Sequence, residues 1–375
     1  MRWTTLHAHR LLDDPKLRQS WDNLNAARHD LPFLSAQAVG TAVQVFGQGQ
    51  ERLLIAADGT GQPLAMMLMV PQGRLCWATF QPSQLPLGAW VSQTHVSTTA
   101  LCRSLLRGPL GFALVVSLTQ ADPLLAPREA DQADTRHADY IPTAWIDVQG
   151  SFDDYWAARG KNLRQNLRKQ RNKLAAEGRN TVLRVLQATE DMAEAIARYG
   201  ELEAAGWKAG RGTAIHPSND QGRFYTQLLE GAARVGEARV YEYLLDGQTV
   251  AMNLCLLRAG TLVVLKTTYD ENLPKSLSPA FLLREEELQQ FFGGSEVKRI
   301  EYYGRVLEWH TKLTEQQRTL YHLTASRWPL LKRLAERRGG TKVAATAVTP
   351  GASDATDNAS AQPHPTTLAT LPGTT

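Results

Sequence analysis

The chain is poor in cysteine, with three among its 375 residues. Cys76, Cys102 and Cys255 lie inside apolar runs, and their separations match neither a zinc site nor a Cys-x-x-Cys redox pair. The sequence therefore predicts buried thiols in a reducing compartment and no metal site.

Long apolar runs are also absent. The longest, Leu64–Val70, has the length of a buried strand and is far shorter than the roughly 18 residues that span a membrane. Residues 1–7 contain no continuous apolar segment of the kind found in a secretory signal. We therefore expect a cytoplasmic protein.

Most of the chain has no strong excess of positive or negative charge, because 41 Lys and Arg residues are nearly balanced by 37 Asp and Glu residues. The segment 159–179 is the exception, since Glu177 is its only acidic residue. Its basic residues are Arg159, Lys161, Arg164, Arg168, Lys169, Arg171, Lys173 and Arg179. The sequence thus indicates one basic helix and not a generally basic surface.

The length exceeds what a single hydrophobic core usually supports, and an apolar fraction of 43% is sufficient for two cores. We predict one domain over residues 1–148 and a second over residues 149–338. From residue 339 onward Ala, Thr, Pro, Ser and Gly dominate, so we expect a disordered tail.

The clearest pattern lies between residues 239 and 304. Two turn signals, Asp246-Gly247 and Ala259-Gly260, separate three apolar runs and predict three antiparallel strands. Ser278-Pro279 suits a helix start, because serine caps a first turn and proline fits the first helical position. A strand over residues 298–303 follows the helix. The class is α/β, with a mainly antiparallel mixed sheet flanked by helices.

The beginning of this pattern occurs once before. Arg52–Ala57, Asp58-Gly59 and Pro63–Val70 repeat the order strand, turn, strand, and the second strand again contains an Ala-Met pair. We interpret this as an internal duplication, with coincidence as the alternative because hairpins with Asp-Gly are common.

The predicted helix start at Ser278 is a candidate phosphate site. Backbone N–H groups of Ala280 and Phe281 are expected to be unpaired there, and such groups attract phosphate. Lys275 lies near enough in sequence to meet a pyrophosphate. An ordinary capped helix beside a solvated lysine is the alternative.

Three segments together resemble the CelD-like acetyltransferases, a branch of the GNAT superfamily related to the FemAB aminoacyltransferases. They are the run from Tyr269 through Ser278-Pro279 to Leu283, the glycine-rich Trp207–Ile215, and the basic helix. The resemblance covers roughly residues 152–323. It departs at Ala280, where the family often has glycine, and the general GNAT phosphate motif Gln/Arg-x-x-Gly-x-Gly/Ala is absent.

The resemblance implies tandem GNAT-like halves, of which the first would shape the acceptor cleft. It implies acetyl-CoA or another acyl-CoA as donor, no metal, and an amine of a sugar or cell-envelope precursor as acceptor. On the acceptor side it assigns Trp207, Lys208 and Tyr269, and it gives His310 and Lys312 an anion-binding role. A lid packed on the core and solvated side chains are the alternatives.

Glu301 and Tyr303 are the candidate catalytic residues. Acylation of an amine needs a base for the amine proton and an acid for the departing thiolate. Alternation along a strand puts Glu301 and Tyr303 on one face and Tyr302 on the other. A polar strand face is the alternative, and Glu203 and Tyr269 are the next candidates.

The basic segment 159–179 has three interpretations. The first is a solvated helix face without a ligand. The second is a binding surface for CoA phosphates, an anionic substrate, a membrane or exopolysaccharide-synthesis machinery. The third is a binding surface for RNA. Nucleic acid is the least supported, because no aromatic residue interrupts the charges. Two other functions stay open: an aminoacyl-tRNA-dependent transferase, and a non-catalytic GNAT-like partner in exopolysaccharide synthesis.

Overall fold

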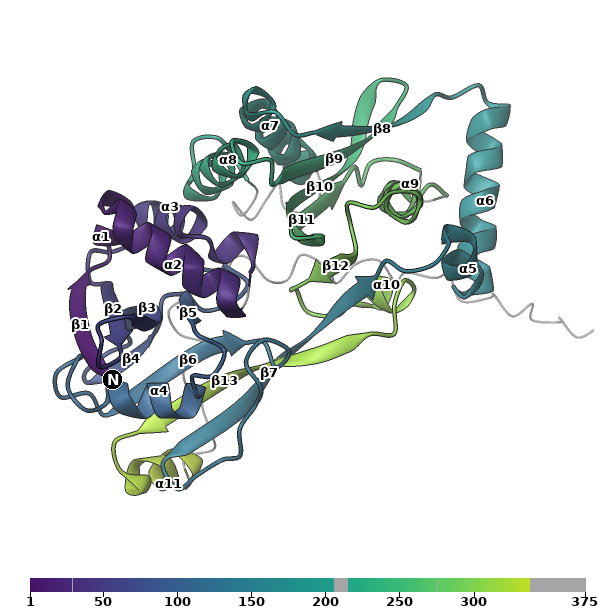
Figure 1. Ribbon diagram of the computed structural model, residues 1–375. Helices are drawn as coiled ribbons and strands as arrows, with labels where there is room; N and C mark the ends of the chain where they lie inside the picture. Colours follow the sequence, from purple (N-terminus) through teal and green to yellow (C-terminus); the bar gives the residue numbers. More distant parts are fainter. Residues whose placement is uncertain (29, 206–214, 275, 338–375) are drawn as a thin grey trace, which may run out of the picture.

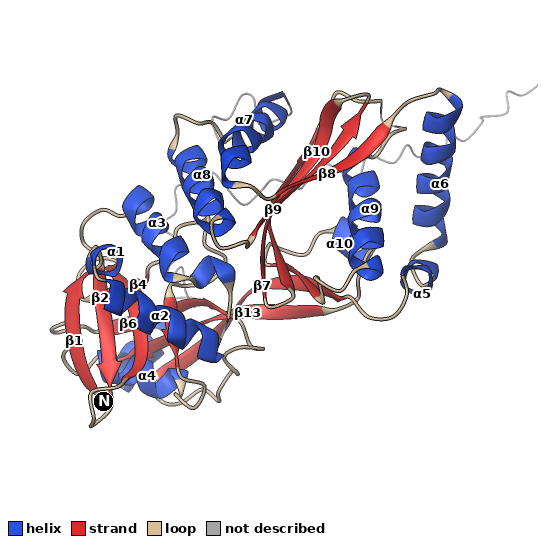
Figure 2. Ribbon diagram, turned by 45° about the horizontal axis from the view of Figure 1, so that its top comes forward, coloured by secondary structure: helices blue, strands red, loops and turns tan. Residues whose placement is uncertain are grey.

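The computed structural model describes residues 1–337 except residues 29, 206–214 and 275. This part of the chain forms a 13-stranded mixed sheet with helices on both faces (Figures 1 and 2). The predicted α/β class is confirmed. Within the described residues, no helix combines the length and apolarity that a membrane span requires.

The first half of the chain contains the strands β1 to β7 and the helices α1 to α4. They are β1 (Arg2–His7), α1 (Arg10–Asp13), α2 (Pro15–Arg28), the 3-10 turn η1 (Pro32–Leu34), α3 (Ala36–Phe46), β2 (Arg52–Ala57), β3 (Pro63–Pro71), β4 (Cys76–Thr79), β5 (Trp90–Ser92), α4 (Thr98–Leu105), β6 (Val115–Ala121) and β7 (Thr135–Asp147).

The second half begins with two helices that have no counterpart in the first. Its elements are α5 (Phe152–Ala157), α6 (Lys161–Ala176), β8 (Thr181–Leu186), α7 (Thr189–Ala205), α8 (Asp220–Ala233), β9 (Ala238–Leu245), β10 (Gln248–Arg258), β11 (Thr261–Tyr269), α9 (Pro279–Gly293), β12 (Arg299–Tyr302), α10 (Glu308–Thr311), β13 (Gln317–Ser326) and α11 (Pro329–Arg337).

The same strand order occurs twice in the sheet. β1 to β4 are joined by antiparallel ladders, and β6 then pairs with β4 in parallel. β8 to β11 are likewise antiparallel, and β12 pairs with β11 in parallel. In each half helices separate the first strand from the second: α1, α2 and α3 in the first half, and α7 and α8 in the second. The repeat recognised in the two hairpins therefore extends to a whole unit of sheet and helices.

The two units meet through two long strands at the centre of the sheet. β13, from the end of the described chain, lies between β6 and β7. β7 pairs with β13 on one side and with β12 of the second unit on the other. The sheet is therefore continuous across residue 148, and the division into residues 1–148 and 149–338 stays a prediction.

Three apolar clusters hold the helices to the sheet. One cluster joins α2 and α3 of the first unit to α7 and α8 of the second, with the rings of Phe46 and Phe224 centred 5.2 Å apart. The second packs α4 under the first unit, and the third packs α9 on β9 to β11. Figure 2 shows α7 and α8 on one face of β8–β11 and α9 on the other.

Backbone geometry confirms the turn predictions around β10. Asp246 and Gly247 have φ values of 50° and 81°, and Ala259 and Gly260 have values of 48° and 82°. Two consecutive residues with positive φ produce the tight turn whose twist matches a hairpin.

Residues 122–139 are polar and contain proline, a composition that predicts a surface loop, yet the last five of them form part of a strand. Thr135 to Asp139 belong to β7, because they pair with Ala325 to Tyr321 of β13. That partner strand is almost 200 residues away in sequence, so local composition gave no sign of it.

Candidate active site

β11 and β12 part beside the start of α9. Their parallel ladder has three pairs, from Thr261↔Arg299 to Val263↔Glu301, whereas β11 continues to Tyr269. A bulge follows at once, since Leu265 is an extra residue opposite Leu254 and Cys255 of β10. A bulge leaves backbone groups unpaired and bends its strand, and bulges are frequent next to active sites. The stretch from Val264 to Tyr269 therefore has an edge that β12 does not cover.

The helix that follows is held in place by the basic helix. The Ser278 N–H donates to Oε1 of Gln170 in α6 at 2.8 Å, and Nε2 of Gln170 lies 3.4 Å from the Ser278 hydroxyl. Pro279 occupies the first helical position as predicted. The start of α9 is thus fixed by α6 and by the geometry of proline.

Two details of the expected phosphate site were wrong. The Phe281 N–H is not unpaired, because it donates to the Ser278 carbonyl at 2.9 Å in a tightened first turn. The Ser278 side chain makes no capping bond to the helix. Ala280 lies in this turn and is partly exposed. Lys275, Trp207 and Lys208, which were also assigned to the site, lie outside the described residues.

A lysine lies directly after the bulge on the face covered by α7 and α8. Nζ of Lys266 lies 3.3 Å from Oε1 of Glu203 in α7, and 5.8 and 5.6 Å from the ring centroids of Tyr199 and Tyr225. The other oxygen of Glu203 accepts from the Ile215 N–H at 2.8 Å. Glu203 therefore lies beside β11, and its place as the next candidate for the base stays a prediction. Sequence reasoning missed Lys266, although a cation directly after the apolar run Thr261–Leu265 within one strand was a usable signal.

Glu301 and Tyr303 lie where the β11–β12 ladder ends. Glu301 is 4% exposed, and its oxygens lie 2.6 Å from Nε of Arg299 and 2.8 Å from Nη2 of Arg318. Burial raises the pKa of Glu301, while Arg318 and Arg299 oppose that change. The carboxylate is therefore ion-paired on both sides.

Tyr303 belongs to the same buried network. Its hydroxyl donates to Oδ2 of Asp122 at 3.3 Å, and Arg318 forms two bonds with the same carboxylate. Burial and the neighbouring carboxylates of Asp122 and Glu301 raise the pKa of Tyr303 well above its usual value, so it keeps its proton at neutral pH. The network joins β6, β12 and β13 and hence the two units.

The opposite face of β11 carries a buried cation that sequence reasoning also missed. Arg284 of α9 is 5% exposed, and its guanidinium lies 3.9 Å from the ring centroid of Trp309. It donates to the Ala280 carbonyl at 3.0 Å and to the Thr267 hydroxyl at 3.2 Å. Arg284 thus connects the first turn of α9 to the uncovered part of β11.

Three residues assigned to substrate surround this cation. Burial and then Arg284 lower the pKa of His310 to about 3, and its Nδ1 accepts from the Leu307 N–H. His310 is therefore neutral at physiological pH, and its expected contact with an anionic acceptor stays a prediction. Lys312 pairs with Glu308 at 2.9 Å and stays partly exposed. Tyr269 ends β11, and burial raises its pKa.

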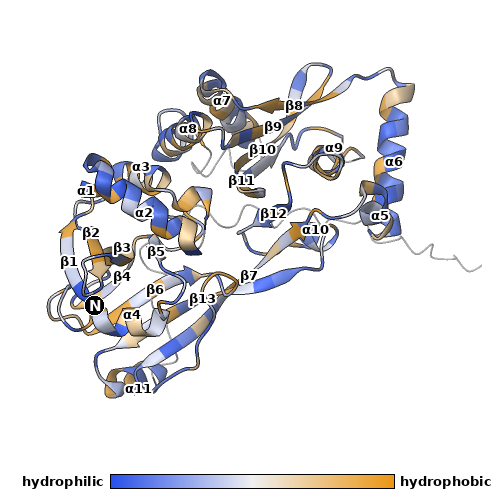
Figure 3. Ribbon diagram, viewed as in Figure 1, coloured by the Kyte–Doolittle hydropathy of each residue, from blue (hydrophilic) through white to orange (hydrophobic). Residues whose placement is uncertain are grey.

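The basic helix α6 has one face on α9 and one face in solvent, and it is mostly hydrophilic (Figure 3). Leu167 and Leu174 are buried, and Arg171 pairs with Glu285 at 2.6 Å and Glu286 at 2.8 Å. Among the described residues, Lys161, Arg168 and Lys169 have no acidic partner and are exposed. Arg171 therefore has a structural role, whereas Lys161, Arg168 and Lys169 are available to a ligand.

In the first unit the corresponding opening is filled by the chain itself. The Thr79 and Thr119 hydroxyls are 2.6 Å apart, and the Thr119 N–H donates to the Thr79 hydroxyl at 2.9 Å. The Gly88 N–H donates to the Thr119 carbonyl, and any Cβ at Gly88 would lie 2.6 Å from the Thr79 hydroxyl. β5 then pairs with β3 where β4 has ended. The opening beside α9 is thus a feature of the second unit.

Within the described residues, no three His, Cys, Asp or Glu side chains converge in a way that would hold a metal ion. The site consists of a bulged strand edge, a helix start, a lysine–glutamate pair on one face and a buried arginine on the other.

Solved structures share this fold at low sequence identity. The C-terminal domain of a putative lysylphosphatidylglycerol synthetase from Agrobacterium fabrum has a TM-score of 0.53 at 14% identity, with 86% of this chain and 97% of that chain covered. FemX has a TM-score of 0.54 at 9% identity, with 88% and 99% covered. A conserved protein of unknown function from Bacteroides thetaiotaomicron VPI-5482 has a TM-score of 0.51 at 12% identity, with 82% and 96% covered.

At these identities the likeness concerns the fold alone. No curated protein sequence matches this chain. Residues 161–309 match the family described as the acetyltransferase (GNAT) domain, and this segment runs from α6 through the bulged strand and α9 to α10. The second half of the chain therefore carries a GNAT acetyltransferase domain, and the protein is an N-acyltransferase of this type.

Proposed function

We propose that the protein transfers an acyl group, acetyl in the simplest case, from acyl-CoA to an amine of a sugar or cell-envelope precursor. The parting of β11 from β12 beside α9 carries this proposal. The uncovered edge of β11 offers unpaired backbone groups to the thioester arm of the donor. The start of α9 supplies the positive end of a helix dipole to its phosphates, with Arg284 close by.

For the chemistry we propose Glu301 and Tyr303. Attack by the neutral amine forms the new C–N bond and breaks the C–S bond, so one proton leaves the amine and one is needed by the thiolate. Both residues lie at the end of the β11–β12 ladder, and the raised pKa of Tyr303 keeps it protonated, as an acid must be. In this scheme Glu301 takes the amine proton through water.

The acceptor would approach from the face that carries Glu203 and Lys266. On this face α3 of the first unit packs against α8, with Nε2 of Gln37 donating to the Gln227 carbonyl. The first unit, whose own opening is closed, is thus available to shape the acceptor cleft. We keep the CelD-like branch as the family within which this acceptor class is expected.

A second candidate is an aminoacyl-tRNA-dependent transferase. The observation that favours it is the exposed row of Lys161, Arg168 and Lys169 on α6, the helix that holds Ser278 at the start of α9. An RNA bound along α6 would bring its charged end to the same opening.

Release of free thiol from acetyl-CoA in the presence of amino sugars tests the main proposal. Turnover that requires both substrates supports it. The absence of turnover, with binding of transfer RNA that weakens steeply with salt, would favour the second candidate. A protein that binds neither donor would be a non-catalytic partner.

A further inference from the structure

The last helix presents apolar side chains to solvent. α11 lies under the first unit, at the opposite end of the molecule from α9 (Figure 1). Trp328 is 50% exposed, Leu330 64% and Leu334 42%. Phe112 is 58% exposed, and its ring centroid lies 6.1 Å from that of Trp328. We call these four residues the apolar patch.

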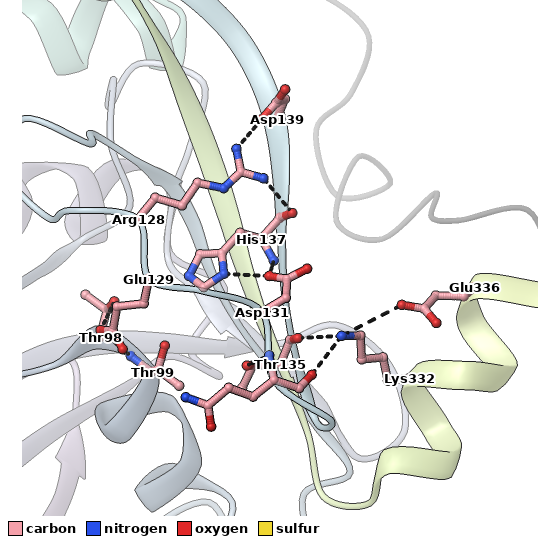
Figure 4. A network of polar contacts seen from close by, with 11 residues as sticks. Thr98, Thr99, Arg128, Glu129, Asp131, Thr135, His137, Asp139, Lys332 and Glu336 are labelled. Carbon is pink, nitrogen blue, oxygen red and sulfur yellow. Dashed lines mark hydrogen bonds and ion pairs between the residues drawn. The ribbon is translucent and has the colours of Figure 1, made fainter.

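The other side of α11 is fixed to the body of the protein. Nζ of Lys332 donates to the carbonyls of Gln132 and Thr135 at 2.8 Å each, so it ties α11 to the start of β7 (Figure 4). The loop before β7 is in turn held by Asp131, which pairs with His137 at 2.8 Å. α11 is therefore oriented by its contacts, and its leucine face points away from the sheet.

Cations lie on the same side of the helix as the exposed leucines. Leu330, Arg333, Leu334 and Arg337 are spaced three and four residues apart and so share one face. Among the described residues, neither Arg333 nor Arg337 has an acidic partner, and both are exposed. A short helix with apolar and cationic groups on its outer face is typical of helices that lie in a membrane interface.

A basic cavity opens beside the patch. Its volume is about 530 Å³, and its lining includes Arg103, Arg107, Arg327 and Trp328. Asp134, which pairs with Arg103, is the acidic residue of the lining. Arg327 donates to the carbonyls of Ala113 and Leu106. Arg107 is therefore the cavity arginine for which the described residues offer no partner, and Trp328 belongs to both the cavity and the patch.

We propose that α11 and this cavity dock the protein on an anionic phospholipid bilayer. The apolar patch would enter the boundary between headgroups and acyl chains, and Arg107 of the cavity would face lipid phosphates together with Arg333 and Arg337. Charge complementarity selects this occupant, because a purely apolar protein partner would leave Arg107, Arg333 and Arg337 without counter-charge. The tail after Arg337 is poor in large apolar residues and does not match the patch.

Docking by α11 leaves the acyltransfer site free, since α9 lies at the other end of the molecule (Figure 1). The inference therefore does not rest on the proposed donor or acceptor. It gives an N-acyltransferase a fixed orientation at a membrane, where lipid-linked envelope precursors would reach it.

The test is flotation of the full-length protein with phosphatidylcholine vesicles, with and without about 30% phosphatidylglycerol. We expect binding to the anionic vesicles. Leu330→Ser with Leu334→Ser should lower the apparent affinity about tenfold or more, because two leucines no longer leave water. Arg333→Gln with Arg337→Gln should lower it about tenfold and flatten its salt dependence.

Matched controls make the result specific. Val235→Ser, at a residue that is 68% exposed and distant from α11, should leave binding unchanged. Lys161→Gln with Lys169→Gln on α6 should do the same. All variants should keep the wild-type free energy of unfolding, since each changed residue is exposed, and the α11 variants and Val235→Ser should also keep acetyl-CoA turnover, since they lie outside α6 and the acyltransfer site.

Three results would overturn the inference. They are no binding of the wild-type chain to anionic vesicles, retention of binding by the leucine variant, and loss of binding in the α6 variant in place of the α11 variants. A dimer that the leucine variant converts to a monomer would assign the patch to a second copy and would overturn it equally.

Discussion

Glu287 gives the protein a stability that depends on pH. It is 6% exposed, and the Asn253 amide donates to both of its oxygens at 2.8 and 2.9 Å. Burial raises the pKa of Glu287 from its ordinary 4.5 to about 7. In the unfolded chain the group loses its proton near the ordinary value. Between these two values the unfolded state therefore binds fewer protons, and stability falls as pH rises.

The magnitude follows from the same two pKa values. At about 1.4 kcal/mol for each pH unit between them, ionising folded Glu287 costs on the order of 3 kcal/mol above neutral pH. Glu287→Gln removes this cost and keeps the shape, and the unpaired Oδ1 of Asn253 can accept from the new amide. The variant should therefore gain stability over wild type as pH increases.

Urea unfolding of both proteins, at roughly pH 5 and pH 8.5, measures the effect. We expect the difference in free energy of unfolding to change by about 2–3 kcal/mol in favour of the variant. Glu201→Gln, at an exposed position of α7, should show no such change. A difference that is the same at both pH values would refute the argument that burial holds the proton on Glu287.

Three other predictions concern the central network and the basic helix. Arg318→Met leaves two buried carboxylates without their shared partner and should cost about 3–5 kcal/mol in urea unfolding; a loss below about 1 kcal/mol would contradict its bridging role. Glu301→Gln and Tyr303→Phe should each lower turnover roughly 10²–10⁴-fold without changing donor affinity by calorimetry, and wild-type turnover in both would move the chemistry elsewhere. Arg171→Gln should lower stability by about 1 kcal/mol, whereas Lys169→Gln should not; equal effects would mean that the ion pairs of Arg171 are not structural.

The sequence predicted the second unit well because its signals are local. The turns at Asp246-Gly247 and Ala259-Gly260 require positive φ, and Pro279 suits the first position of a helix. Gly160, a poor helix former, likewise lies where the helices are interrupted, since α5 ends at Ala157 and α6 begins at Lys161. These features depend on residues that are adjacent in the chain.

Long-range pairing was not predictable in the same way. The length of β7 depends on its pairing with β13. The position of β13 depends in turn on its pairing with both β6 and β7. β1 was not predicted, because most of its residues are exposed and carry no apolar signal of a strand. It lies at the edge of the sheet and pairs with β2. Composition does not identify a strand whose partner is far away.

The candidate site was predicted in part for the same reason. The helix start at Ser278 was visible as a motif, but its hydrogen bonds to Gln170 join segments 108 residues apart. Lys266 and Arg284 were passed over because each is a single cation that directly follows an apolar run. Their roles emerge when the bulge in β11 and the stacking on Trp309 are known.

The central claim is that acyl-CoA binds at the opening beside α9 in the second unit and not in the first. Titration calorimetry with acetyl-CoA on Ala280→Val and Ala100→Val tests it, because both alanines lie in the first turn of the helix that precedes the parallel strand of its unit. We expect Ala280→Val to weaken binding, since the added methyl groups crowd the approach of the phosphates, and Ala100→Val to bind as wild type. Unchanged affinity in a folded Ala280→Val variant, or weakened binding in Ala100→Val, would contradict the account.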